Sequence, residues 1–106
     1  MTAINELERN YRAAFLRYLP SHDEAALHVG YQIGRAAVGD GLSLLELAHV
    51  HHRVFLEVLT DTPPGDLPGV AAAASDFFLQ VLSTYDIAQR AYLAGVDRAD
   101  HNTPAR

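Results

Sequence analysis

The chain contains no cysteine, no lysine and no tryptophan. Without cysteine it has no disulfides, no thiolate metal ligands and no cysteine nucleophile, so nothing in it indicates secretion. No apolar run approaches the roughly 20 residues that span a bilayer, and the first residues lack the basic start and apolar block of a signal peptide. We therefore expect a cytoplasmic protein with no membrane partner.

Positive charge is scarce and scattered. The formal net charge is −5, and all eight basic residues are arginines scattered along the chain without a cluster. A nucleic-acid-binding face needs clustered basic residues that neutralise phosphates. The charge pattern therefore argues against nucleic acid as a partner.

A length of 106 residues fits one domain with one hydrophobic core. Hydrophobic residues make up 49% and charged residues 20% of the chain, a balance typical of globular proteins. We expect one helical domain over residues 1–97. The last residues, 98–106, are expected to form a polar tail or the start of a linker to a following domain.

Apolar residues at steps of three and four predict helices in the first half of the chain. The first helix is expected from a cap at Thr2 to about residue 19, where Pro20 ends it. Ser21-His-Asp-Glu24 matches the capping box, so a second helix is expected over residues 21–40. Gly41 is expected to cap its C-terminal end.

The same signals predict two further helices. Ser43-Leu-Leu-Glu46 repeats the capping box and opens a third helix that reaches about residue 59. The segment 61–69 contains three prolines and two glycines and is expected to be a loop, followed by a fourth helix over about residues 68–97. Short connections favour antiparallel neighbours, so the predicted fold is all-α, an antiparallel four-helix bundle.

More apolar surface is present than one such bundle can bury. The third helix is apolar around much of its circumference, and the fourth, about 45 Å long against about 27 Å for the first, overhangs its neighbours. The overhang carries Ile87, Ala91, Tyr92, Leu93 and Val96. Because exposed apolar helix faces need cover, we predict a homodimer. Its interface is expected to include Val54, Phe55, Val58 and Tyr92.

Two glycines and two alanines form a row of small residues on the second helix. Gly30 and Gly34 follow Ala26 and precede Ala37 at steps of three and four. Small residues in such a row let another helix approach closely. We expect tight helix packing in water at this row, because charged residues flank it.

The histidines of the third helix suggest a metal site, but a solvated helix surface is the simpler explanation. Glu46, His49 and His52 share one helix face. Metal-binding bundles, however, collect Glu and His from several helices, and no second Glu-x-x-His occurs. His51 lies on the packed row, where a buried imidazole bonded to a neighbour is expected.

Catalysis has no candidate residues. The histidine-kinase pattern requires an acidic residue directly after the histidine, whereas Arg53 follows His52. Phosphotransfer domains keep a lysine near the histidine, and the chain has none. The serines lack an evident His-Asp arrangement, and no glycine-rich phosphate loop is present. We predict no enzyme activity and no cofactor for this chain.

The helical pattern as a whole resembles the N-terminal domain of RsbU-type phosphatases, over nearly everything up to Tyr92. The residues that carry the resemblance are Tyr31-Gln-Ile-Gly-Arg35, Gly41-Leu-Ser-Leu-Leu-Glu-Leu-Ala48, His51-His52, Phe78-Leu-Gln-Val-Leu-Ser-Thr-Tyr85 and Arg90-Ala-Tyr92. The resemblance implies a homodimeric four-helix domain related in fold to the C-terminal domain of the clock protein KaiA.

The resemblance also implies a function. In the family this domain receives a switch protein similar to RsbT, a small kinase-like regulator, and so activates an attached PP2C-type phosphatase. That phosphatase controls an anti-sigma pathway. We therefore expect a regulatory interaction domain of a bacterial stress-response protein that works by partner switching.

A partner-binding face is expected where aromatic and arginine residues, which are enriched at binding hot spots, lie on the second and fourth helices. These residues are Tyr31, Arg35, Phe78, Leu82, Tyr85 and Ile87. Plain core packing is the simpler explanation for the aromatic ones.

Two other functions compete with this interpretation. One is a ligand-sensing bundle with an apolar pocket lined by Tyr11, Phe15, Tyr85 and Tyr92. The other is a metal-binding bundle that uses Glu46, His49 and His52.

Overall fold

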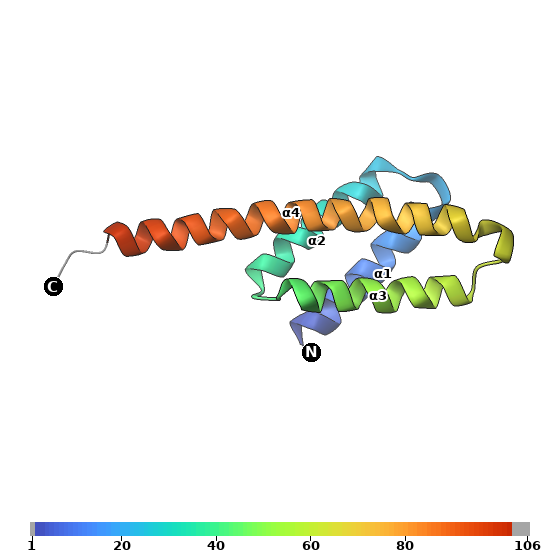
Figure 1. Ribbon diagram of the computed structural model, residues 1–106, viewed down its shortest axis with the longest axis horizontal. Coiled ribbons are helices and arrows are strands. Elements are labelled where there is room, and N and C mark those ends of the chain that lie inside the picture. Colours follow the sequence, from blue (N-terminus) through green and yellow to red (C-terminus); the bar gives the residue numbers. More distant parts are fainter. Residues whose placement is uncertain (1, 103–106) are drawn as a thin grey trace.

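The computed structural model describes the backbone of residues 2–102 and the side chains up to Gly95. Over that part the chain is helical and contains no β-strand, which confirms the all-α class (Figure 1). Its elements are α1 Ala3–Ser21, α2 Glu24–Gly39, α3 Leu44–Thr60, the 3₁₀ helix η1 Pro64–Asp66 and α4 Leu67–Asn102.

The helices form two antiparallel pairs. In Figure 1, α3 and α4 run in opposite directions along the long axis of the molecule, and α1 and α2 cross behind them obliquely. The most extensive packing is between α2 and α4, while α1 contacts each of the other three helices. The regular antiparallel bundle and the homodimer remain predictions.

The boundary between α1 and α2 differs from the predicted one. The helix continues past Pro20 to Ser21, and the N–H of His22, in a left-handed conformation with φ of 51°, donates to the Tyr18 carbonyl oxygen at 2.8 Å. The imidazole of His22 also stacks on the Tyr18 ring. Because Ser21 belongs to α1, the predicted capping box is wrong, and Asp23 caps α2 instead by accepting from the Ala25 N–H.

The end of α2 confirms Gly41 as a cap. Gly41 has a φ of 74°, which favours glycine because it has no Cβ. Its N–H donates to the Val38 carbonyl oxygen at 3.0 Å, and the N–H of Leu42 donates to the Ala37 carbonyl oxygen at 2.9 Å. This pair of bonds is the Schellman motif, and it turns the chain directly toward α3.

The start of α3 confirms the second capping box. The Ser43 hydroxyl accepts from the Glu46 N–H at 3.1 Å, and the Glu46 carboxylate accepts from the Ser43 N–H at 2.9 Å. Each side chain thus satisfies a backbone donor that the helix leaves free. The third helix therefore begins where the sequence predicts.

The last helix is longer than expected. It begins at Leu67, inside the segment predicted to be a loop, and its backbone continues to Asn102, past the predicted end near residue 97. The segment before it contains η1. Residues 103–106 of the predicted tail lie outside the described part, and the domain boundary at 97 remains a prediction.

The core is aromatic and centres on Phe77 of α4. The ring of Tyr11 meets it edge-on at 5.2 Å between centroids, and the rings of Phe15 and Tyr18 lie at 5.7 Å from it. The largest fully buried side chains are Tyr11, Phe15, Phe77, Leu47, Val50, Val54 and Val81. Side chains from each of α1, α3 and α4 therefore contribute to one core.

The row of small residues on α2 packs on α4, as predicted. Ala26, Gly30, Gly34 and Ala37 are all buried. A Cβ on Gly34 would collide with the backbone of Val81 and with that of Tyr85. The two helices therefore approach to backbone contact at Gly34.

Candidate functional site

The end of α4 extends beyond the other helices and carries exposed apolar side chains. The molecule measures 65 × 27 × 18 Å, with α4 along the longest dimension (Figure 1). Ile87, Tyr92 and Leu93 are 64%, 59% and 54% exposed. The surplus apolar surface predicted for this helix is therefore present. Val96, predicted to belong to it, lies outside the residues whose side chains are described.

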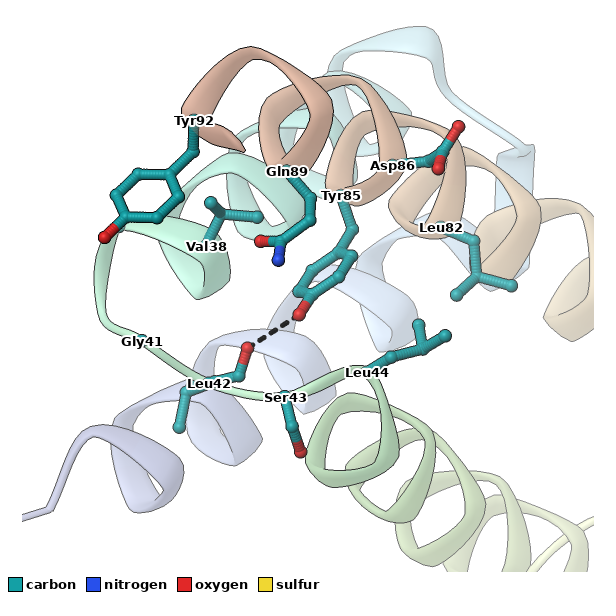
Figure 2. Close-up of a pocket in the computed structure, with 11 residues that line it drawn as sticks. Val38, Gly41, Leu42, Ser43, Leu44, Leu82, Tyr85, Asp86, Gln89 and Tyr92 are labelled. Carbon is teal, nitrogen blue, oxygen red and sulfur yellow. Dashed lines mark hydrogen bonds between the residues drawn. The ribbon is translucent and has the colours of Figure 1, made fainter. Parts of the chain in front are cut away.

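A groove opens where α4 passes the turn between α2 and α3. It has a volume of about 770 Å³ and is open to solvent. Figure 2 shows Leu44 and Leu82 at one end of this groove and Tyr92 at the other. The Tyr85 hydroxyl lies between them and donates to the Leu42 carbonyl oxygen at 2.8 Å (Figure 2).

The groove is better suited to binding apolar groups than to catalysis. Its walls are aliphatic and aromatic, with Asp86 and Gln89 among its few polar side chains. The Ser43 hydroxyl in the groove already accepts from the Glu46 N–H. No acid, base and nucleophile come together among its lining residues, so its geometry supports binding.

Three of the six predicted partner-binding residues meet in a second groove. Tyr31 and Arg35 of α2 and Ile87 of α4 line a hollow of about 460 Å³ on the other side of α4, and Tyr92 lines both grooves. Leu82 and Tyr85 line the first groove instead. The predicted set is therefore divided between two sides of α4.

Two of the predicted interface residues are core residues. Tyr85 is only 7% exposed and its hydroxyl is bonded to Leu42, so its ring packs inside the chain and cannot serve as a partner anchor. Val54 is fully buried, because it lies on the side of α3 that faces the core, and it cannot form a dimer seam. Phe55 and Val58 are half-buried, and Tyr92 is exposed. The remaining interface assignments stay predictions.

His51 is half-buried, and its predicted bond to a neighbouring side chain is present. Its Nδ1 lies 2.7 Å from the Tyr11 hydroxyl, and its ring stacks on Phe78 with 3.9 Å between centroids. Burial lowers the pKa of His51 to about 4, with a smaller contribution from His52. The imidazole is therefore neutral near pH 7, and its Nδ1 can accept a hydrogen bond from the Tyr11 hydroxyl. Phe78 packs on His51, so packing within the chain accounts for an aromatic residue at this position and no binding partner is needed.

The structure does not assemble the alternative sites. Glu46 uses its carboxylate in the α3 cap, and the side chains described, those up to Gly95, include no group of three or more His, Asp or Glu placed to hold a metal ion. Tyr11 and Phe15 are packed against Phe77 and do not line the groove that contains Tyr85 and Tyr92. The predicted four-residue ligand pocket is therefore wrong.

Sequence reasoning missed a charged network that joins α1 to α3. Arg12 donates from two nitrogens to the two carboxylate oxygens of Glu57, each at 2.9 Å, and Arg53 donates to Glu8 at 2.7 Å. The hydrogen bond from Arg12 lowers the pKa of Glu57. Only the Glu8–Arg12 pair, four residues apart on one helix, could have been found from spacing.

Comparison with known proteins identifies a protein family to which this chain is similar. Residues 9–88 match the family described as "Phosphoserine phosphatase RsbU, N-terminal domain". No curated protein and no solved structure matches the chain. The matched range starts in α1, includes all of α2 and α3 and ends within α4, before the exposed Tyr92 and Leu93. Every helix in the part of the chain that the structure describes is too short or too polar to span a bilayer. By the extent of this match, the chain belongs to the family of RsbU N-terminal domains.

Proposed function

We propose that this chain is a non-catalytic regulatory domain of a bacterial signalling protein. It forms a homodimer, binds a switch-kinase-like activator similar to RsbT, and so controls an attached PP2C-type phosphatase in a partner-switching stress response. Family membership supports the regulatory role, because the matching family is the N-terminal domain of a phosphatase. Catalysis belongs to the attached domain in this proposal.

The observation that carries the proposal is the course of α4. This helix begins in the core, where Phe77 and Val81 are fully buried, and then extends beyond the other helices with Ile87 and Tyr92 exposed. A continuous helix transmits a change in position or orientation along its length. A shift of α4 caused by binding at the grooves would therefore be passed to the proposed phosphatase domain attached after α4.

The activator is proposed to dock in the groove lined by Tyr31, Arg35 and Ile87. Arg35 supplies a charge-assisted donor and the other two supply apolar area, a combination that is common at protein interfaces. The net charge of the chain is −5, so a basic activator face would also be attracted to it.

Calorimetric titration of the chain with an RsbT-type switch protein tests this proposal. Ile87→Glu is expected to weaken binding by roughly tenfold or more, because it places a charge in an apolar contact. Leu16→Glu is the matched control, since Leu16 is also about half-exposed but lies outside the grooves. No measurable binding by the wild-type chain would refute the partner.

A second candidate function rests on the 770 Å³ groove. Its apolar walls and few polar groups are typical of sites for small apolar ligands. A fluorescent apolar probe that binds the wild-type chain but not a Leu82→Glu variant would support ligand sensing. Equal signal from both would remove this groove as a ligand site.

A further inference from the structure

The outer face of α3 carries an exposed row opposite its buried side. The side chains that face the core are Leu47, Val50 and Val54. The exposed row consists of Leu45, His49, His52 and Leu56. The steps of four, three and four residues place these side chains in one narrow stripe, with the spacing of a coiled-coil seam. Leu45 is 68% exposed, so the stripe is open to a partner.

This row reads the same in both directions. Its pattern is Leu-x3-His-x2-His-x3-Leu from residue 45 to residue 56. Two copies related by a twofold axis present the same patch to each other, so the patch must be complementary to itself. A palindromic stripe meets this condition when the two helices are antiparallel. Leu45 then faces Leu56 of the second copy, and His49 faces its His52.

We propose that a second copy of this chain docks on this row, with α3 against α3 in antiparallel orientation. This seam presupposes the homodimer of the proposed function and places it on the outer side of α3. It differs from the seam predicted from sequence, because Val54 is buried in the core of a single chain.

The paired histidines fit this arrangement chemically. A neutral imidazole has one N–H donor and one nitrogen acceptor. Two imidazoles that meet across the seam can therefore satisfy each other by an N–H···N hydrogen bond. Leucines at both ends of the row exclude water from this bond. The seam thus has apolar ends and a polar centre that fixes the register, as buried polar residues do in coiled coils.

The flanks of the row are also complementary. Glu46 and Arg53 lie on one side of it, and Ala48 and Phe55 on the other. In the antiparallel pair, Glu46 lies beside Arg53 of the second copy, and the Phe55 ring lies beside its Ala48. Glu46 binds the Ser43 N–H and Arg53 binds Glu8, but each keeps further hydrogen-bonding capacity.

The absence of cysteine allows a direct test of this seam. His49→Cys and His52→Cys are made separately, allowed to exchange subunits, and oxidised alone or mixed. The proposal predicts fast disulfide formation in the mixture and slow formation in either variant alone, because residue 49 faces residue 52. Fast crosslinking of each variant with itself would indicate parallel helices and overturn the proposal.

Charge substitution separates this seam from the homodimer itself. Light scattering is expected to show that Leu45→Glu and Leu56→Glu each weaken dimerisation by roughly a hundredfold, since each change occurs twice in the dimer. Leu16→Glu on α1 is the control and is expected to leave the dimer intact, because Leu16 is exposed and lies outside this row and both grooves. Ile87→Glu is measured beside it to test an interface on α4. Circular dichroism verifies that all variants fold.

The outcomes distinguish the two proposals. A wild-type chain that stays monomeric at micromolar concentration would refute the homodimer and this seam together. A dimer that survives both leucine substitutions and shows no mixed crosslink would refute only the α3 seam. Loss of the dimer with Ile87→Glu alone would place the interface on α4 instead.

Discussion

The hydroxyl of Tyr85 on α4 donates a 2.8 Å hydrogen bond to the backbone carbonyl oxygen of Leu42 in the turn between α2 and α3. This bond joins the Schellman turn to α4 immediately before Ile87 and the rest of the exposed segment. It therefore anchors the point where α4 leaves the helical body. The same contact forms one wall of the larger groove (Figure 2).

Tyr85→Phe is expected to destabilise the fold by about 1–2 kcal/mol, because it removes the donor and leaves the Leu42 carbonyl oxygen without this partner in a buried position. Urea unfolding followed by circular dichroism measures the change. Tyr92→Phe is the control, since Tyr92 is 59% exposed, and its stability should match the wild type. Equal stability of both variants would show that the bond contributes little.

Gly34→Ala is expected to destabilise the chain by about 1–3 kcal/mol, because the added methyl group collides with the α4 backbone and forces α2 away. Gly39→Ala provides the comparison, since nothing lies within 4 Å of the position of its Cβ. There the better helix propensity of alanine should add up to about 1 kcal/mol. Thermal unfolding of the two variants should shift in opposite directions, and a common shift would contradict the close approach.

Acid should weaken the fold through His51. Its folded pKa of about 4 lies below the ordinary value of 6.5, so the unfolded chain binds the proton more readily. Stability is therefore complete above about pH 6.5 and falls as the pH drops toward 4. The loss is about 2 kcal/mol, since partial exposure of the ring reduces the full linkage value.

His51→Gln isolates this effect, because glutamine keeps an acceptor for the Tyr11 hydroxyl but does not titrate. Urea unfolding at pH 7 and at pH 4.5 should show a smaller acid loss in the variant than in the wild type. His49→Gln changes an exposed histidine and should keep the wild-type difference. An identical acid loss in all three proteins would exclude His51 as the cause.

Truncation on the two sides of α3 should have unequal effects on stability. Val54→Ala is expected to cost about 2 kcal/mol, because Val54 is fully buried and a cavity remains. Leu56→Ala should change the stability of the monomer by less than about 0.5 kcal/mol, since Leu56 is half-exposed. Unfolding is measured at a protein concentration low enough for the proposed dimer to dissociate. A large loss in Leu56→Ala there would mean that its side chain is buried in the monomer.

Local chemistry explains which features were predictable. A helix cap bonds only to residues a few positions away in the chain. The three caps that the sequence predicts correctly are Thr2, the pair Ser43 and Glu46, and Gly41. Ser21 has the same local pattern as Ser43 but continues α1 instead. At Ser21 the helix end is closed one residue later, where the N–H of His22 donates to the Tyr18 carbonyl oxygen and the two rings stack.

The sequence alone determined the helices, the small-residue contact and the excess of apolar surface, because these follow from spacing and size along one helix. It could not determine which apolar residues of α3 face inward, since that depends on where α1 and α4 lie. The packed fold buries Val54 and leaves Leu45 and Leu56 exposed. Likewise, residues far apart in the chain, such as Tyr85 and Leu42 or Arg12 and Glu57, meet only because tertiary packing brings their helices together.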